Sequence, residues 1–167
     1  MPIRQLPQMR REDDQRELKI LPKSTGERGT HMTTAQARVK KKSFGYELLL
    51  DLYDCNPGVC DDLDLCYRFL DTIVGELGME KQAPPSIFRS DAERYPDKAG
   101  LSGWVPLIES SVVIHTLSPK NFITIDVYCC RDFDEEKALE SCKRHFLPNR
   151  VESQFLHRGQ TYYDDKD

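Results

Sequence analysis

A serine pair and a histidine lie in one apolar stretch of this sequence, at a spacing that could support nucleophilic chemistry. The stretch runs from residue 100 to residue 116 and is rich in β-branched residues, yet Glu-Ser-Ser at 109–111 interrupts it where a strand would carry valines. In an extended strand, His115 lies on the same face as Ser111 and Val113. We therefore expect a nucleophile and a base to share a pocket there.

The same residues also allow an ordinary structural interpretation. A polar tripeptide with Pro106 close by is most often a turn or a bulge, and a strand histidine most often has a satisfied hydrogen-bonding partner. Cys129 and Cys130, which follow a second apolar run, fit small core residues equally well. Residue types and spacing alone leave both interpretations open.

Hydrophobic periodicity predicts the elements that position these residues. An apolar run at Tyr46–Tyr53 predicts the first strand, which ends at a turn rich in Asn, Pro and Gly. An Asp at 61 or 62 can cap a helix whose apolar residues recur at three- and four-residue steps up to Gly78. Residues 79–99 hold three prolines among polar residues, which predicts a loop with a short strand at Ser86–Arg89.

The second half of the chain predicts a hairpin, a helix and a final strand. A short turn leads into the alternating strand Phe122–Cys130, which carries polar residues on one face. Asp134 caps a helix that is acidic at its start and basic at its end, Pro148 stops it, and Arg150–Leu156 predicts the last strand. Two helices and a mostly antiparallel sheet predict an α+β fold, a two-layer sandwich with both helices on one face of the sheet.

Composition and charge divide the chain into three parts. Its 167 residues, 38% of them hydrophobic, suffice for one domain with a single core. Residues 1–43 hold 11 Lys and Arg against 5 Asp and Glu and few aliphatic residues, which predicts a flexible basic tail. A domain at 44–158 and a polar C-terminal tail at 159–167 follow. The basic tail has no aromatic residue to stack on bases, so nucleic acid is not an expected partner.

The sequence also argues against a membrane partner and a metal. No apolar run approaches the roughly 20 residues of a membrane span, and the N-terminus lacks the layout of a signal peptide, so we expect a cytoplasmic protein. The six cysteines include no Cys-x-x-Cys pair, and only four histidines exist to help them. We expect reduced thiols and no metal site.

The order and spacing of several short motifs resemble the pyruvoyl-dependent S-adenosylmethionine decarboxylases, especially the short bacterial and archaeal form. The resemblance covers the chain from about residue 45 to about residue 158. It rests on Leu-Tyr-Asp-Cys-Asn-Pro at 52–57, Gly-Leu-Ser-Gly at 100–103, Glu-Ser at 109–110, Ile-His-Thr at 114–116, Asp-Val-Tyr-Cys-Cys at 126–130, and Arg-Val-Glu at 150–152 with Arg-Gly at 158–159.

The resemblance implies that the chain makes its own cofactor. This family cuts a Glu-Ser bond and turns the serine into an N-terminal pyruvoyl group, which places cleavage between Glu109 and Ser110. The serine hydroxyl attacks the preceding carbonyl, and the resulting ester is eliminated by a base, so an oxyanion donor and a base are needed. By resemblance, Ser102 supports processing and His115 is the processing base. The pyruvoyl group forms a Schiff base with the substrate amine and acts as an electron sink, and Cys130 returns a proton to the substrate carbon.

Three departures from the family pattern concern cleavage and substrate. Ser111 stands where the short form has a histidine, so Glu-Ser-Ser is similar to the eukaryotic cleavage site. After Ile-His-Thr the family continues Trp-Pro-Glu, but this chain has Leu-Ser-Pro at 117–119, which removes an aromatic ring and a carboxylate that help hold the nucleoside. Glu47 replaces a family histidine in the first strand. Tyr95 and Glu109 are the candidates for adenine stacking and ribose binding.

Three hypotheses for the function remain. The first is a pyruvoyl-dependent decarboxylase of S-adenosylmethionine in polyamine (spermidine) biosynthesis. The second is a pyruvoyl-dependent decarboxylase of ornithine or arginine, in which acidic pocket residues meet the distal cation. The third is an unprocessed homologue that regulates an active partner, against which the retention of Ser110, His115 and Cys130 counts. The resemblance also implies a homodimer of processed protomers with active sites near the interface.

Overall fold

The computed structural model describes residues 43–108 and 110–164 of the chain. The predicted basic tail therefore lies outside the described residues, except for Ser43. Two α-helices and six strands follow one another within the described part: β1 (Gly45–Tyr53), α1 (Leu63–Glu76), β2 (Ser86–Arg89), β3 (Leu101–Pro106), β4 (Ser110–Leu117), β5 (Phe122–Cys129), α2 (Glu135–Phe146) and β6 (Arg150–Arg158).

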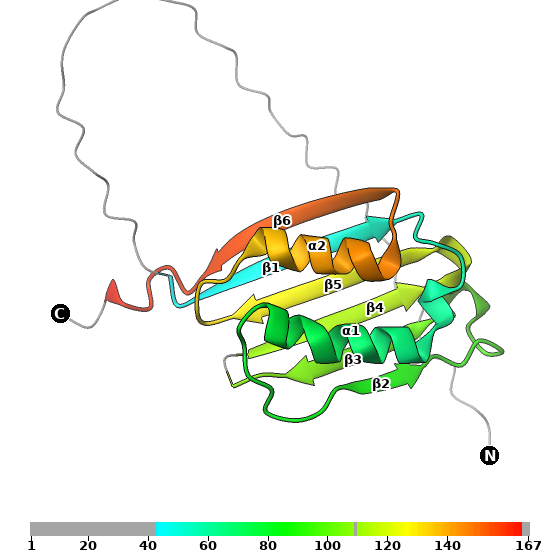
Figure 1. The fold of residues 1–167 in the computed structure, drawn as a ribbon, viewed down its shortest axis with the longest axis horizontal. Helices are drawn as coiled ribbons and strands as arrows, with labels where there is room; N and C mark the ends of the chain where they lie inside the picture. The colour runs from blue at the N-terminus through cyan, green and yellow to red at the C-terminus, as the bar shows by residue number, and fades with distance from the viewer. Residues whose placement is uncertain (1–42, 109, 165–167) are drawn as a thin grey trace, which may run out of the picture. The chain divides into compact units, whose positions relative to one another are not determined.

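The six strands form one sheet in the order β2-β3-β4-β5-β1-β6. Every neighbouring pair in this sheet is antiparallel. Both helices lie against the same face of the sheet, with α1 over β2, β3 and β4 (Figure 1). The predicted α+β two-layer sandwich is confirmed.

The core lies between the helices and the sheet, because alternate strand residues point to opposite faces. On β5, Ile123, Ile125, Val127 and Cys129 are buried, whereas the residues between them are partly exposed. From the helix layer, Phe69 of α1 meets Phe146 of α2 edge to face, with ring centroids 4.9 Å apart. The opposite side of the sheet, here called the outer face, carries no described helix and holds the polar side chains.

The helix ends follow the capping residues that the sequence predicts. The Asp62 carboxylate accepts a hydrogen bond of 2.9 Å from the Leu65 N–H, and Asp134 accepts one of 3.1 Å from the Lys137 N–H. α1 is followed by Gly78 with φ 65°, a left-handed conformation that favours glycine. Within the described residues, neither helix is long and apolar enough to cross a membrane.

The last strand is longer than predicted. β6 runs to Arg158, two residues beyond the predicted end at Leu156, because it pairs with β1 over the whole length of that strand. Just beyond the pair, the Phe44 N–H donates to the Gly159 carbonyl (3.4 Å) and the Phe44 ring packs on Tyr162 at 4.6 Å. The two boundaries of the predicted domain are therefore in contact with each other.

We expect Phe69→Ala to lower the free energy of unfolding by about 3–5 kcal/mol, because it leaves a cavity where a fully buried ring contacts Phe146. Urea denaturation of the two proteins measures the difference. Tyr67→Ala on the same helix, where the side chain is 39% exposed, is the matched control and should change stability by less than about 1 kcal/mol. Equal losses for the two variants would contradict the proposed core.

Candidate active site

Ser110 is the first residue of β4 and closes a tight hairpin with β3. The Leu107 N–H donates to the Ser110 carbonyl (2.9 Å), and the Ser110 N–H donates back to the Leu107 carbonyl (3.3 Å). Only residues 108 and 109 connect the pair, and Glu109 lies outside the described residues. Two-residue hairpins favour Asn or Gly in these positions, and this chain has Ile and Glu. The predicted cleavage bond therefore lies in a connection that lacks the residues tight turns favour.

The backbone of Ser110 is itself unusual. Its φ is 156°, a value that residues with a side chain rarely adopt. The cost of such a conformation is of the order of 1–3 kcal/mol, and it persists only where the surrounding structure imposes it. Here the β3–β4 ladder imposes it, so local strain sits on the residue that the sequence predicts as nucleophile.

Cys130 lies beside Ser110 at the end of the neighbouring strand. Ser110 pairs with Cys129 across the β4–β5 ladder, which places Cys130 one residue away. The Cys129 side chain is buried, and its sulfur accepts a hydrogen bond from the Arg131 N–H (3.4 Å), whereas Cys130 is exposed. Of these two neighbouring thiols, Cys130 is therefore the one accessible from solvent.

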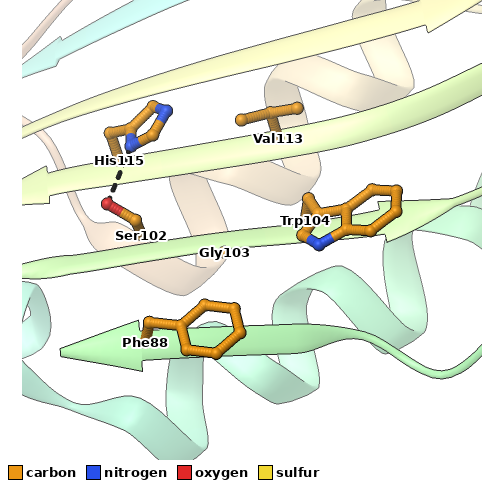
Figure 2. Close-up of a pocket in the computed structure, with 6 residues that line it drawn as sticks. All are labelled: Phe88, Ser102, Gly103, Trp104, Val113 and His115. Atoms are coloured by element: carbon orange, nitrogen blue, oxygen red, sulfur yellow. Dashed lines mark hydrogen bonds between the residues drawn. The ribbon is translucent and has the colours of Figure 1, made fainter.

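His115 and Ser102 form a hydrogen-bonded pair on the outer face. They lie directly opposite each other on β4 and β3, and His115 Nδ1 is 3.0 Å from Ser102 Oγ (Figure 2). Both side chains are exposed, so the pair is accessible from solvent. The structure thus brings together the two residues that the sequence predicts as processing base and support.

A buried hydroxyl holds the two strands in place behind this pair. Thr116 Oγ1 donates to the Cys60 carbonyl (2.6 Å) and accepts from the Leu101 N–H (2.7 Å). Thr116 follows His115 in sequence, and Leu101 precedes Ser102. At Gly100, an added Cβ would lie 2.1 Å from the Thr116 carbonyl oxygen, so only glycine permits this close approach of the strands.

Ser110 and His115 are not brought together within one chain. They are five positions apart on β4, which at 3.3 Å per residue is about 16 Å. Ser111, Val113 and His115 do share the outer face, but the shared pocket that the sequence predicts does not form in a single chain. One chain therefore carries two separate groups: Ser110 with Cys130, and Ser102 with His115.

Between β5, β1 and β6 the outer face has a hollow of about 270 Å³ rich in carboxylates, here called the acidic hollow. It is lined by Leu49, Asp51, Thr124, Asp126, Glu152, Ser153 and Gln154. Partial burial raises the pKa of Asp126, and the negative charges of Glu47 and Asp51 raise it further, while His115 opposes the shift. Because carboxylates that repel one another favour a cation nearby, this hollow suits a positively charged group.

Glu47, whose role the motifs do not indicate, has a partner in the structure. Its carboxylate lies 3.3 Å from the Arg158 guanidinium, which also lies over the Tyr128 ring at 4.5 Å. Tyr128 in turn packs on Gly45, where an added Cβ would lie 2.8 Å from the ring. Glu47 therefore orders the outer ends of β1, β5 and β6 on the side of the sheet where β4 begins.

A second hollow of about 280 Å³ lies on the outer face over β2, β3 and β4, and we call it the aromatic hollow. It is lined by Phe88, Ser102, Gly103, Trp104, Val113 and His115 (Figure 2). The side chains of Phe88 and Trp104 are 66% and 46% exposed, so most of each ring is available for contact. Neither residue is among the site residues that the sequence predicts. The alternation of β3, which places Trp104 on the same face as Ser102, was the signal that could have found Trp104.

Tyr95, one of the two predicted substrate-binding residues, lies away from both hollows. Tyr95 is 44% exposed beside a short helical turn, with the Arg94 guanidinium 5.1 Å and the Lys98 ammonium 5.9 Å from its ring centre. It lines neither hollow. Glu109 lies outside the described residues. All six cysteines are free thiols, and residues 43–108 and 110–164 contain no His, Cys, Asp or Glu cluster that could hold a metal ion.

Comparisons with known proteins agree with this geometry. The family model for S-adenosylmethionine decarboxylase matches residues 46–159. The S-adenosylmethionine decarboxylase proenzyme of Thermotoga petrophila is 30% identical over 125 residues, covering 74% of this chain and 89% of that protein. The proenzyme of Acidithiobacillus ferrooxidans is 27% identical over 120 residues, covering 71% and 85%.

A solved structure shows the same fold. The crystal structure of the adenosylmethionine decarboxylase from Aquifex aeolicus superposes with a TM-score of 0.60 at 25% sequence identity, and the match covers 71% of this chain and 92% of that one. The chain belongs to the S-adenosylmethionine decarboxylase family. The family predicted from short motifs is thereby confirmed.

We expect Asp126→Asn to stabilise the protein at pH 7 and to have little effect at pH 3. The raised pKa means that the folded state holds the Asp126 proton more tightly than the unfolded chain, so stability is lost as pH rises from the ordinary value of 3.8 through the raised one. Asn removes that loss. Melting temperatures at the two pH values measure the effect against the exposed Asp132→Asn as control. A larger stabilisation at pH 3 than at pH 7 would contradict the assignment.

Proposed function

We propose that this chain is the proenzyme of a pyruvoyl-dependent S-adenosylmethionine decarboxylase, which cuts itself before Ser110 and supplies decarboxylated S-adenosylmethionine for polyamine biosynthesis. The observation that carries this is the position of Ser110, strained at the closing pair of the β3–β4 hairpin with the exposed Cys130 thiol beside it. Membership of the family, whose curated relatives are named proenzymes, supports it.

Self-cleavage needs a sequence of steps at the Glu109-Ser110 bond. The Ser110 hydroxyl attacks the Glu109 carbonyl carbon, and the acyl group passes from nitrogen to oxygen to give an ester. A base removes the Ser110 α-proton, and the carboxylate of Glu109 leaves with the electron pair of the C–O bond. Water then releases the nitrogen as ammonia, which leaves a ketone at residue 110. The strained φ of Ser110 favours the first step, because leaving the amide relieves strain.

The residues around Ser110 fit the resulting group. The pyruvoyl group supplies a carbonyl that takes up the electron pair when carbon dioxide leaves the substrate. Cys130 then donates its proton to the substrate carbon, a role that a thiol near neutral pH can fill because its proton is held yet transferable. Glu47 and Arg158 hold Tyr128 over the strand end beside Ser110.

Two copies of the chain are needed to complete the site. His115 and Ser102 lie about 16 Å along the sheet from Ser110, too far to act on the cleavage bond of their own chain. The outer face that carries Ser102 and His115 has no described element covering it, so a second copy can pack there and bring the start of its β4, with Ser110, to the first copy's His115. We therefore include a homodimer in the proposal, with each active site shared between protomers.

The direct test of the proposed function is an intact mass measurement of the purified protein. We expect two fragments, one ending at Glu109 and the other running from residue 110 to 167 with a ketone in place of its N-terminal amine. Ser110→Ala, which lacks the nucleophile, should remain one chain. Cys130→Ala should be cut but should release carbon dioxide slowly, by about 10²-fold or more, because the proton donor is missing. A single full-length mass for the wild type would refute self-processing and would favour a regulatory homologue.

The shared site predicts complementation between two inactive variants. Ser110→Ala and His115→Ala should each stay uncut when expressed alone. When they are expressed together, the mixed dimer has one site with an intact Ser110 facing an intact His115, so the His115→Ala chain should be cut in part. Co-expression of Ser110→Ala with the double variant Ser110→Ala/His115→Ala is the control. No cleavage in the mixed sample would contradict sharing of the site.

A second substrate class is favoured by one observation, the acidic hollow. Its carboxylates could meet the distal cation of ornithine or arginine on the same cofactor. Release of carbon dioxide by cleaved protein should be measured side by side with S-adenosylmethionine, ornithine, arginine and lysine. We expect turnover of S-adenosylmethionine. If the protein decarboxylates a free amino acid and not S-adenosylmethionine, that amino acid becomes the proposed substrate. The roles of Ser110 and Cys130 would stay as proposed.

A further inference from the structure

We propose that Cys55 and Cys60 form a reversible disulfide, a modification site that slows self-cleavage when the chain is oxidised. The two residues lie at the ends of the turn that follows β1, and the motif that contains Cys55 has no role in the proposed chemistry. The effect on cleavage rests on the proposed function, whereas formation of the disulfide does not. The oxidant is hydrogen peroxide, and a dithiol reductant restores the two thiols.

The first argument is that the two sulfur atoms meet over the same part of the sheet. Cys55 Sγ lies 3.7 Å from the Leu52 carbonyl oxygen. Cys60 Sγ lies 3.8 Å from the Phe122 carbonyl oxygen. Leu52 on β1 pairs with Ile123 on β5, the residue that follows Phe122. The two thiols are also in hydrogen-bonding contact with each other, so a disulfide needs only a small approach of two side chains.

The second argument is that this contact polarises the pair in the way that thiol oxidation requires. The hydrogen bond from Cys55 lowers the pKa of Cys60, although burial opposes that shift. The same hydrogen bond, together with burial, raises the pKa of Cys55. Cys60 is therefore the sulfur that becomes a thiolate, the form that attacks an oxidant, and Cys55 keeps its proton. A third thiol in this region, Cys66, stays protonated because burial raises its pKa to about 12.

The third argument is a route by which a small oxidant can reach this buried pair. The side chains of Cys55 and Cys60 are only 2% and 1% exposed, but Cys55 lines a hollow of about 300 Å³. The hollow is lined by Asp54, Cys55, Asn56, Pro57, Asn121, Leu147 and Asn149. These residues belong to the connections that follow β1 and α2 and precede β5, at one end of the sheet. The hollow is therefore not part of the outer face on which the proposed second copy packs, and hydrogen peroxide is small enough to enter it.

The chemistry balances with hydrogen peroxide as the only co-reactant. The Cys60 thiolate attacks one peroxide oxygen, an S–O bond forms and the O–O bond breaks. The departing hydroxide takes up the proton that Cys60 lost and becomes water. The Cys55 sulfur then attacks the sulfur of the Cys60 sulfenic acid, and the hydroxyl leaves with the Cys55 proton as a second water. Two thiols are oxidised to one disulfide, and one peroxide is reduced to two waters.

The fourth argument is that the pair is joined to the processing base through one carbonyl group. Cys60 is the middle residue of a short helical turn, Val59–Asp61. Its carbonyl accepts from Thr116 Oγ1 (2.6 Å) and from Ser118 Oγ (3.3 Å). An S–S bond is about 2.05 Å long, well below the separation of two thiols in contact, so the turn must move toward β1 and carry this carbonyl with it. Thr116 follows His115 on β4, so the shift reaches the residue proposed as the base.

Differential thiol labelling tests whether the disulfide forms. The protein is uncut Ser110→Ala, so that the result does not depend on self-cleavage. After treatment with hydrogen peroxide, free thiols are blocked in denaturant with light iodoacetamide, disulfides are reduced, and the released thiols take heavy iodoacetamide. Peptide mass spectrometry should find heavy label on Cys55 and Cys60. Cys142, which is equally buried, is the matched control and should carry light label.

Hydrogen exchange tests whether the disulfide reaches β4. The Leu101 N–H donates to Thr116 Oγ1 (2.7 Å), so its exchange rate reports on the hydroxyl that the Cys60 carbonyl holds. We expect faster exchange at Leu101 in oxidised Ser110→Ala than in the reduced protein, and dithiothreitol should restore the slow rate. The double variant Ser110→Ala/Cys55→Ala, which cannot form the disulfide, should show one rate under both conditions.

A time course of cleavage tests the effect on processing. The wild-type chain is made by cell-free synthesis, translation is stopped, and cleavage is followed with hydrogen peroxide or with reductant. We expect severalfold slower cleavage with peroxide, and a single rate under both conditions for Cys55→Ala. Oxidation of the exposed Cys130 does not disturb this measurement, because Cys130 is proposed to act in decarboxylation and not in cleavage.

Three outcomes would overturn the inference. Light label on both Cys55 and Cys60 would mean that they are inert buried thiols. Heavy label on Cys60 together with Cys66 would mean that a different pair forms. Equal cleavage rates in the two conditions, with the disulfide present, would remove the effect on processing. A wild-type chain that is not cleaved even with reductant would refute the proposed function, whereas labelling and hydrogen exchange would still decide whether the disulfide forms.

Discussion

The alternation of side chains along β4 is the constraint on which the rest of the site depends. A shift of one residue against β3 or β5 would turn His115 into the core and bring Ile114 to the surface. The buried Thr116 hydroxyl, bonded to the Cys60 carbonyl and the Leu101 N–H, stabilises the correct register from the core side. This one register places His115 opposite Ser102. It also places Ser110, with its strained φ, at the start of β4.

The outer face combines three kinds of surface that a globular domain would not normally leave open. It has an aromatic hollow over β2 to β4, an acidic hollow over β5, β1 and β6, and an ion pair between Glu47 and Arg158 beside the start of β4. The helices cover the other face, which holds most of the buried core, so the residues that stabilise the fold and the candidate site residues lie largely on opposite faces of the sheet. Substitutions on the inner face should alter folding, while those on the outer face can vary with substrate.

Much of this arrangement was accessible from the sequence. Helix caps at Asp62 and Asp134, the strand alternation of β5 and the α+β class follow from local rules, and the motifs identify the family. The aromatic hollow was not predicted, because Phe88 and Trp104 lie on strands whose pairing depends on a long loop between them. The separation of Ser110 from His115 was missed for a related reason. Residues on one face of a strand do not necessarily share a pocket, because Ser110 and His115 are five positions apart on an eight-residue strand.

The strand order has a consequence for what happens after the chain is cut before Ser110. The two pieces would not be separate domains, because the first supplies β1, β2 and β3 and the second supplies β4, β5 and β6. In the sheet, β1 lies between β5 and β6, and β3 lies beside β4, so the pieces interleave and share three ladders of backbone hydrogen bonds. The helices interleave too, with α1 from one piece packed on α2 from the other. Cutting one peptide bond would therefore convert a single polypeptide into a heterodimer of two fragments. These fragments could separate only if the shared sheet and the helix contact unfolded.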